Sequence, residues 1–169
     1  MTITITLERP DTPAAQALIT ELQTHLELCY PPESRHGFSV ERLIAESVPF
    51  VVLRTDGVSA GCGGIKLVGN AYGELKRMYV RPAFRGQGFG KLLVHYLTSY
   101  AQTQGVPLAR LETGIYQHAA IQLYEQLGFY RIPPFGPYRI DPVSLCYEKP
   151  LDTTLPPPQH LGHLGKEVL

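Results

Sequence analysis

The spacing of apolar residues predicts regular elements from the start of the chain. Apolar side chains occupy every second position of Thr2–Leu7, a period typical of a strand with one buried face. Apolar residues then recur at helical spacing from Ala15 to Leu26, and Thr12 is a suitable N-cap residue for that helix. The helix must end near Tyr30, because two prolines follow it. The start of the chain therefore predicts a strand followed by a helix.

Strands and helices continue to alternate over the rest of the chain. The strand over 72–80 contains an odd step between Leu75 and Met78, which fits either a β-bulge or a strand buried on both faces. Residues 132–142 hold four prolines, so we expect a stiff loop there. The other expected elements are a short helix over 40–46, strands over 50–54 and 59–68 that turn at Asp56-Gly57, a helix with its apolar stripe from Phe89 to Tyr100, a strand over 108–113, a helix with its stripe from Ala120 to Leu127, and a strand over 143–147.

Alternating strands and helices that share one sheet predict an α/β (α+β) domain with a mixed sheet. A chain of 169 residues is long enough for one domain with its own core, which we expect over 1–151. Residues 152–169 contain three consecutive prolines and no clear apolar period, so we expect a loose C-terminal tail. Two histidines in this tail, His160 and His163, are too few for a metal site, and we expect no metal.

Composition and charge exclude several classes of protein. The 15 Lys and Arg residues balance the 15 Asp and Glu residues, whereas broad nucleic-acid binding needs a basic surface. No apolar run is long enough to span a membrane. The three cysteines form no C-x-x-C pair, so neither a disulfide framework nor a zinc site is indicated, and free thiols fit a cytoplasmic location. The sequence leaves monomer and homodimer open.

The most informative segment is Arg85–Lys91, a glycine-rich turn between a strand-like run and a helix-like run. The first N–H groups of a helix lack internal partners and the helix dipole is positive there, so such a turn attracts phosphate. Its glycine spacing does not match a dinucleotide fingerprint. It also lacks the leading glycine and the Ser or Thr of a P-loop. A different phosphate-bearing ligand is therefore indicated.

Two segments carry a resemblance to a known family. Arg85-x-x-Gly88-x-Gly90 follows the strand Leu75-Lys-Arg-Met-Tyr-Val-Arg-Pro82, and Ala120-Ile-Gln-Leu-Tyr-Glu-Gln-Leu-Gly-Phe129 lies downstream of it. Together they resemble the GNAT superfamily of acyl-CoA-dependent N-acetyltransferases. The resemblance implies a single GNAT-like domain, in which about six or seven strands form a mixed sheet splayed at a bulge and about four helices flank it. It also implies acetyl-CoA as the cosubstrate.

The resemblance places the diphosphate of the cofactor at the glycine-rich turn, where Arg85 supplies charge and backbone N–H groups can donate hydrogen bonds. It places the pantetheine arm along the opened edge of the preceding strand, where its amides can pair with the backbone like an added strand. Gln117 stands where the family often has asparagine, so an amide remains but is one methylene longer. The expected cofactor-binding residues are Met78, Tyr79, Val80, Arg85, Gly86, Gln87, Gly88, Gly90, Lys91 and Gln117.

Acetyl transfer to an amine needs a general base, an oxyanion donor and a general acid. A lysine-like amine, with a pKa of about 10.4, is mostly charged at neutral pH and must lose a proton. Glu74 stands where several GNAT enzymes carry the base, and Glu112 on the neighbouring strand is a rival. The resemblance assigns the acid to Tyr124 and the oxyanion donor to the backbone N–H of Val80. The alternatives are a core aromatic role for Tyr124 and a solvated charge at the strand end for Glu74. For Glu112, the alternative is an ion pair with Lys76 or Arg110.

Two loops, over 30–37 and 132–142, are expected to border the acceptor. Both signs of charge are present in them, so the expected acceptor is the primary amine of a small molecule, such as a zwitterionic amino acid, or of a peptide end. We therefore predict an N-acetyltransferase that uses acetyl-CoA by direct attack. The alternatives are an acyl-CoA-binding regulatory module without turnover and a structural interaction domain. The expected acceptor-side residues are Glu33, Arg35, His36 and Tyr138, with Arg139 and Asp141 nearby.

Overall fold

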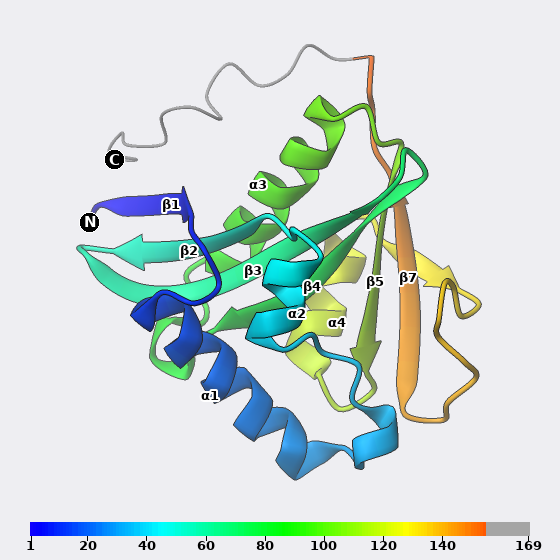
Figure 1. Cartoon of the computed structure of the whole chain (residues 1–169), viewed down its shortest axis with the longest axis horizontal. Helices are drawn as coiled ribbons and strands as arrows, with labels where there is room; N and C mark the ends of the chain where they lie inside the picture. Colours follow the sequence, from blue (N-terminus) through cyan, green and yellow to red (C-terminus); the bar gives the residue numbers. More distant parts are fainter. Residues whose placement is uncertain (155–169) are drawn as a thin grey trace.

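Seven strands form one mixed sheet in the order β1-β2-β3-β4-β5-β7-β6 (Figure 1). The structure is a computed structural model that describes residues 1–154. It confirms the predicted α/β fold. The strands are β1 (Ile3–Leu7), β2 (Phe50–Thr55), β3 (Val58–Val68), β4 (Tyr72–Val80), β5 (Leu108–Gly114), β6 (Tyr130–Ile132) and β7 (Ser144–Pro150). The helices are α1 (Pro13–Cys29), α2 (Val40–Ala45), α3 (Phe89–Thr103) and α4 (His118–Gln126), with 3-10 turns η1 (Pro32–Ser34) and η2 (Pro82–Phe84).

Helices cover both faces of the sheet, with α1 and α2 on one side and α3 and α4 on the other (Figure 1). On the α3 side, Leu93 belongs to one buried cluster with Val51 and Leu53 of β2. On the α1 side, Leu18 belongs to a second cluster with Val52 of the same strand. Because β2 is buried on both faces, its apolar residues form a continuous run rather than an alternating pattern.

The helix α1 begins and ends where the sequence predicts. Thr12 is its N-cap residue, and the Thr12 Oγ1 accepts a hydrogen bond from the N–H of Ala15 at 3.3 Å. Tyr30 is the extended C-cap residue, and Pro31 follows it. The hydroxyl of Tyr30 accepts a hydrogen bond from the N–H of Tyr116 at 3.0 Å. The end of α1 therefore lies against the connection between β5 and α4.

The strand β4 contains a β-bulge, one of the two explanations that its odd apolar step allowed and the one that the family resemblance implied. Lys76 pairs with Gly64 and Tyr79 pairs with Cys62, so two residues of β4 face one residue of β3. Arg77 is the first residue of the bulge and has a φ of 54°, in the left-handed region. A bulge bends the strand that carries it, which fits the course of β4 beyond this point.

The strands β4 and β5 separate beyond their first residues. Their parallel pairing is limited to Gly73 with Ala109 and Glu74 with Arg110. Figure 1 shows the two strands diverging toward their C-terminal ends. The later part of β4 therefore has a backbone edge without a strand neighbour on the β5 side, as the predicted splayed sheet requires.

The differences from the predicted elements lie near the C-terminus. A short strand, β6, includes Ile132, and the irregular loop begins only after it. Three residues are too few for a periodic signal, and the antiparallel pairing of β6 with β7 defines the strand. The strand β7 extends to Pro150, beyond the predicted end at 147. From residue 155 onward, the tail predicted over 152–169 lies outside the described residues.

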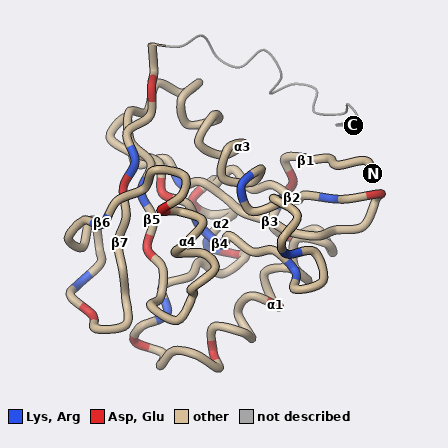
Figure 2. The backbone as a smooth tube through the Cα atoms, turned by 180° about the vertical axis from the view of Figure 1, so that it is seen from behind, with Lys and Arg blue, Asp and Glu red and all other residues tan. Residues whose placement is uncertain are grey.

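Basic and acidic positions are interspersed along the described chain (Figure 2). Ion pairs of opposite charges join separate elements, such as Arg81 with Glu21 at 2.7 Å and Arg110 with Glu148 at 2.7 Å. Among the helices of residues 1–154, none combines the length and the apolar character needed to cross a bilayer.

Candidate active site

The glycine-rich turn leads into an open N-terminus of α3. Gly88 is the N-cap residue with a φ of 82°, and no side chain caps the first turn of the helix. Glycine adopts this backbone conformation without steric penalty, whereas most other residues are strained in it. Gly86, Gly90 and Lys91 line the cavity in front of the turn. The uncapped N–H groups and the positive end of the helix are suited to a diphosphate.

A cavity of about 510 Å³ extends from this turn along β4 to α4; we call it the cofactor cavity. Among the predicted cofactor-binding residues, Gln87 does not line it, and the Gln87 side chain is exposed. The remaining predicted residues are brought together around the cavity: Met78, Tyr79, Val80, Arg85, Gly86, Gly88, Gly90, Lys91 and Gln117.

The backbone of β4 presents alternate groups to its open edge. The N–H of Arg81 donates to the carbonyl of Ala60 on β3 at 2.8 Å. Successive residues of a strand direct their backbone groups to opposite sides, so the N–H groups of Val80 and Met78 face the opening. The Val80 carbonyl accepts a hydrogen bond from Nε of Arg85 at 3.0 Å. This edge can pair with the amides of an extended ligand.

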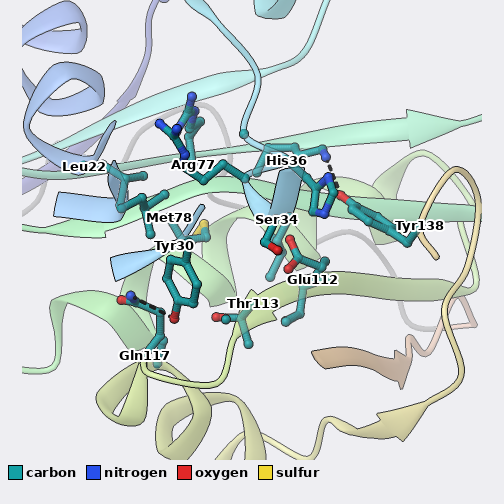
Figure 3. Close-up of a pocket in the computed structure, with 18 of the residues that line it drawn as sticks. Leu22, Tyr30, Ser34, His36, Arg77, Met78, Glu112, Thr113, Gln117 and Tyr138 are labelled. Atoms are coloured by element: carbon teal, nitrogen blue, oxygen red, sulfur yellow. Dashed lines mark hydrogen bonds between the residues drawn. The ribbon is translucent and has the colours of Figure 1, made fainter. Parts of the chain in front are cut away.

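A second cavity, of about 120 Å³, adjoins the first and is shown in Figure 3; we call it the acceptor cavity. Two neighbouring cavities that share a wall can hold a cofactor and a second substrate end to end. The residues that line both cavities are Leu22, Met78, Gln117, Ala120 and Tyr124.

Tyr124 lies on α4 at the junction of the two cavities and is only 5% exposed. Its ring packs edge-on against Phe129, with the ring centres 5.7 Å apart. Burial raises the pKa of the Tyr124 phenol, so the hydroxyl keeps its proton at neutral pH. A protonated hydroxyl at this junction is suited to donate a proton to a leaving group.

Glu112, on β5, lines the acceptor cavity. Its Oε1 accepts a hydrogen bond from Oγ of Ser144 on β7 at 2.9 Å. Burial raises the pKa of Glu112 from its usual 4.5 to about 7, although the Ser144 hydrogen bond and the charge of Lys76 both lower it. A carboxyl group that titrates near neutrality is suited to act as a general base.

Glu74 belongs to a buried cluster and does not line the acceptor cavity. Its carboxylate forms an ion pair with Nζ of Lys76 at 2.6 Å and accepts a hydrogen bond from the Tyr138 hydroxyl at 2.5 Å. Nζ of Lys76 donates to the same hydroxyl at 2.7 Å. Desolvation lowers the pKa of Lys76, and the charge of Glu74 opposes this shift. The cluster therefore ties the loop that carries Tyr138 to β4.

The two loops predicted to border the acceptor are joined to each other. The Ser34 hydroxyl donates a hydrogen bond to Oδ2 of Asp141 at 2.7 Å. Glu33 lines a separate hollow between the loops rather than the acceptor cavity. The other three predicted acceptor-side residues do line the acceptor cavity: Arg35, His36 and Tyr138.

Arg77 lines the acceptor cavity but was not singled out from the sequence. A bulge in this strand would account for the unusual backbone of Arg77. The direction of the Arg77 side chain, however, depends on the distant loop that contains Gly37. The guanidinium lies beside Gly37, where an added Cβ would be only 2.3 Å from Cζ of Arg77. Ser144 was also missed, because it is an ordinary residue within an expected strand.

The two buried thiols, Cys62 and Cys146, are not suited to covalent catalysis. Burial raises the pKa of the Cys62 and Cys146 thiols, which disfavours the nucleophilic thiolate. Cys29 is also a free thiol. Within residues 1–154, no group of three or more His, Cys, Asp or Glu side chains is arranged to hold a metal ion.

The site thus combines a sheet that opens between two parallel strands with an uncapped helix end at one side of the opening, an arrangement suited to a ligand that carries both a diphosphate and an extended amide arm. The Acetyltransferase (GNAT) family matches residues 19–129. The chain belongs to this family and is an acyltransferase, which confirms the resemblance seen in the two sequence segments.

Individual relatives agree with this assignment. An Azospirillum brasilense protein named IAA acetyltransferase is 41% identical over 150 residues, which cover 88% of this chain and 98% of the relative. The crystal structure of a Klebsiella pneumoniae protein, classed as an acyl-CoA N-acyltransferase, has a TM-score of 0.75 and 36% identity over 89% of this chain and 98% of its own. PaiA N-acetyltransferase from Thermoplasma acidophilum, solved with coenzyme A, shares the fold with a TM-score of 0.70 at 19% identity, covering 89% and 100% of the two chains.

Proposed function

We propose that this protein transfers an acetyl group from acetyl-CoA to a primary amine by direct attack. The observation that carries the proposal is the placement of Glu112 and Tyr124. Glu112 lines the acceptor cavity, and Tyr124 lines both cavities. A base on the acceptor side and an acid at the junction are the two proton-handling groups that aminolysis of a thioester needs.

In the proposed reaction, the cofactor's diphosphate binds the start of α3, and its pantetheine arm lies along Met78 and Val80 of β4. The acceptor enters as an ammonium ion and loses a proton to the ionised carboxylate of Glu112, directly or through water. We favour Glu112 over Glu74 because the Glu74 carboxylate is already held by Lys76 and Tyr138.

The neutral amine nitrogen then attacks the thioester carbonyl carbon, and the carbonyl π pair moves onto oxygen. In this proposal the N–H of Val80, on the open edge of β4, donates a hydrogen bond to the oxyanion. Collapse re-forms the carbonyl and breaks the C–S bond. The departing sulfur takes a proton from the Tyr124 hydroxyl, and the second proton of the nitrogen passes, directly or through water, to the Tyr124 phenolate and restores the hydroxyl. The products are the N-acetylated acceptor and CoA.

Two measurements test this proposal. Calorimetry with CoA measures cofactor binding, and thiol release from acetyl-CoA measures turnover with a panel of acceptors. The panel holds amino acids, alkylamines and peptides with free amino ends, and it includes IAA because of the relative named for it. We expect CoA to bind and at least one primary amine to raise thiol release well above the rate without acceptor.

The two assays separate the competing functions. Binding of CoA without release from any acceptor would favour a non-catalytic acyl-CoA-binding module. Absence of CoA binding would contradict both functions.

A further inference from the structure

The Arg77 side chain is bound to groups that lie outside the acceptor cavity. Its guanidinium donates through Nε to the Phe38 carbonyl at 2.7 Å and through Nη2 to Oε1 of Gln23 at 2.9 Å. Phe38 and Gln23 lie outside the described linings of both cavities. The Arg77 guanidinium therefore contacts the structure that supports the cavity rather than the space inside it.

A chain of polar contacts continues from Arg77 along α1. Gln23 accepts from Arg77 and donates through Nε2 to Oε1 of Glu27 at 2.9 Å, one helical turn further along. Glu27 pairs in turn with Nη1 of Arg35 at 3.3 Å. We call Arg77, Gln23, Glu27 and Arg35 the α1 relay. It connects the bulge of β4 to the loop that follows α1.

The α1 relay and the Phe38 contact hold the two ends of one wall of the acceptor cavity. Residues 35–37 line this cavity. Arg35 begins the segment and Phe38 follows it, and both are connected to Arg77. Between them, an added Cβ at Gly37 would be 2.3 Å from Cζ of Arg77. A segment fixed at both ends has few alternative conformations, so one arginine restricts this wall.

The backbone of Arg77 is itself fixed at the bulge. Its φ of 54° lies in the left-handed region, and a non-glycine residue stays there only where its surroundings hold it. The two hydrogen bonds of the guanidinium do so, together with the Cys62 thiol, which donates to the Arg77 carbonyl at 3.4 Å. The bulge therefore gives the wall a fixed point of attachment.

We propose that Arg77 is a positioning residue, which holds residues 35–37 through the α1 relay and Phe38 and thereby sets the affinity and size selectivity of the acceptor cavity. This inference rests on the proposed acetyl transfer and adds a residue that governs the choice of acceptor. Glu112 lies on β5 and Tyr124 on α4, outside the α1 relay. Loss of Arg77 should therefore affect acceptor binding rather than proton transfer.

The kinetics of Arg77→Met test the inference at saturating acetyl-CoA. For the most active acceptor of the panel, we expect KM to rise about tenfold or more, because two hydrogen bonds of a charged group are lost. The kcat and the Kd for CoA should change by less than about threefold. The ratio of kcat/KM for phenethylamine to that for ethylamine, which differ in bulk, should shift by about threefold or more. Arg9→Met, which removes an arginine paired with Asp11, is the matched control.

Variants of the α1 relay test whether Gln23 transmits the effect. Gln23→Met keeps the side-chain length, removes both hydrogen bonds and should raise KM about threefold or more. It also serves if Arg77→Met does not fold. Glu27→Gln removes the charge that pairs with Arg35, and Glu41→Gln, at an exposed position of α2, is its control.

Arg77 and Glu27 both bond to Gln23, so their effects should not add. We expect the double variant, Arg77→Met with Glu27→Gln, to raise KM by no more than about twofold over Arg77→Met alone. Additive effects in KM would overturn the transmission through the α1 relay.

Limited proteolysis tests the wall without turnover. Trypsin can cleave after Arg35, in the wall, and after Arg85, in the exposed turn before α3. In CoA-free protein, the rate after Arg35 relative to that after Arg85 should rise about threefold or more in Arg77→Met and in Gln23→Met, because local opening of the wall becomes easier. An equal rise at both sites would indicate general destabilisation and would overturn the inference.

Failure of the inference is distinct from failure of acetyl transfer. An unchanged KM in folded Arg77→Met, or an equal loss of kcat with every acceptor at constant KM, would overturn the inference and leave the proposed function standing. If no acceptor supports release by the parent protein, acetyl transfer is contradicted and the proteolysis ratio decides alone. A raised ratio then supports the fixed wall, and an unchanged ratio overturns it.

Discussion

The hydroxyl of Tyr138 donates a hydrogen bond to the carboxylate of Glu74 at 2.5 Å, although 64 positions separate the two residues in the chain. The same hydroxyl accepts a hydrogen bond from Lys76. Glu74 is therefore engaged in a buried polar cluster, whose other two members, Lys76 and Tyr138, line the acceptor cavity. Glu112 is the glutamate that lines the cavity itself. The two carboxylates predicted as rival bases thus lie in different environments, and we propose a structural role for Glu74 and a chemical role for Glu112.

Replacing Glu74 should affect stability more than chemistry. Glu74→Gln leaves the buried ammonium of Lys76 without its counter-charge, and breaking a buried pair costs about 3–5 kcal/mol. We expect a loss of this order in the free energy of unfolding, measured by urea titration. Glu46→Gln is the control, because Glu46 pairs with Lys66 and Arg42 at the surface and such pairs contribute about 1 kcal/mol or less. Equal small losses in both variants would contradict a structural role for Glu74.

Glu112 should make the protein less stable as the pH rises. Its pKa is raised from 4.5 to about 7 by folding, so its contribution to stability is fully present below pH 4.5 and is lost as the pH rises through 7. Glu112→Gln removes this dependence. Between pH 5 and pH 8, we expect the variant to lose less stability than the parent protein by about 1–3 kcal/mol. Parallel pH–stability curves from urea unfolding would argue against the raised pKa.

Tyr124→Phe should separate turnover from binding. The ring is retained and can still pack against Phe129, so we expect little change in melting temperature or in CoA affinity. Without the hydroxyl, the leaving sulfur has no proton donor at the junction, and kcat should fall by about 10²-fold or more. Steady-state thiol release and calorimetry measure the two effects. An unchanged kcat would show that the Tyr124 hydroxyl is not the acid.

The open end of α3 can be tested by charge. Gly88→Glu places a carboxylate where the proposed diphosphate binds, and we expect CoA binding to be lost in calorimetry. Gly88→Asn is the matched control, because asparagine tolerates the left-handed backbone found at this position and adds no charge. Retained affinity in Gly88→Glu would place the diphosphate elsewhere. Equal loss in both variants would indicate a backbone effect instead.

The sequence predicted the parts of the site that depend on local pattern. The turn at Arg85–Lys91 is specified by residues a few positions apart, as is the N-cap of α1 at Thr12. The bulge in β4 left only an ambiguous local signal, which the family resemblance resolved. The different surroundings of Glu74 and Glu112 were not predictable, because Glu74 is bound by Tyr138 from a loop with no periodic signal.

The position of the Arg77 side chain could not be predicted from the sequence for the same reason. Nothing near residue 77 shows that Gly37 leaves room for a guanidinium. Tertiary packing decides which side chains from distant loops contact each other, and these contacts cannot be predicted from the local pattern of a single sequence.

We propose that Glu112 removes the proton from the acceptor, and the pH dependence of kcat/KM tests this role most directly. With saturating acetyl-CoA and a reactive amine, we expect kcat/KM to rise with pH through a limb near 7, as the Glu112 carboxyl ionises. Glu112→Gln should lower the plateau by about 10²–10⁴-fold and abolish this limb, whereas folded Glu74→Gln should keep it. A limb near 7 that survives in Glu112→Gln but disappears in Glu74→Gln would contradict the assignment.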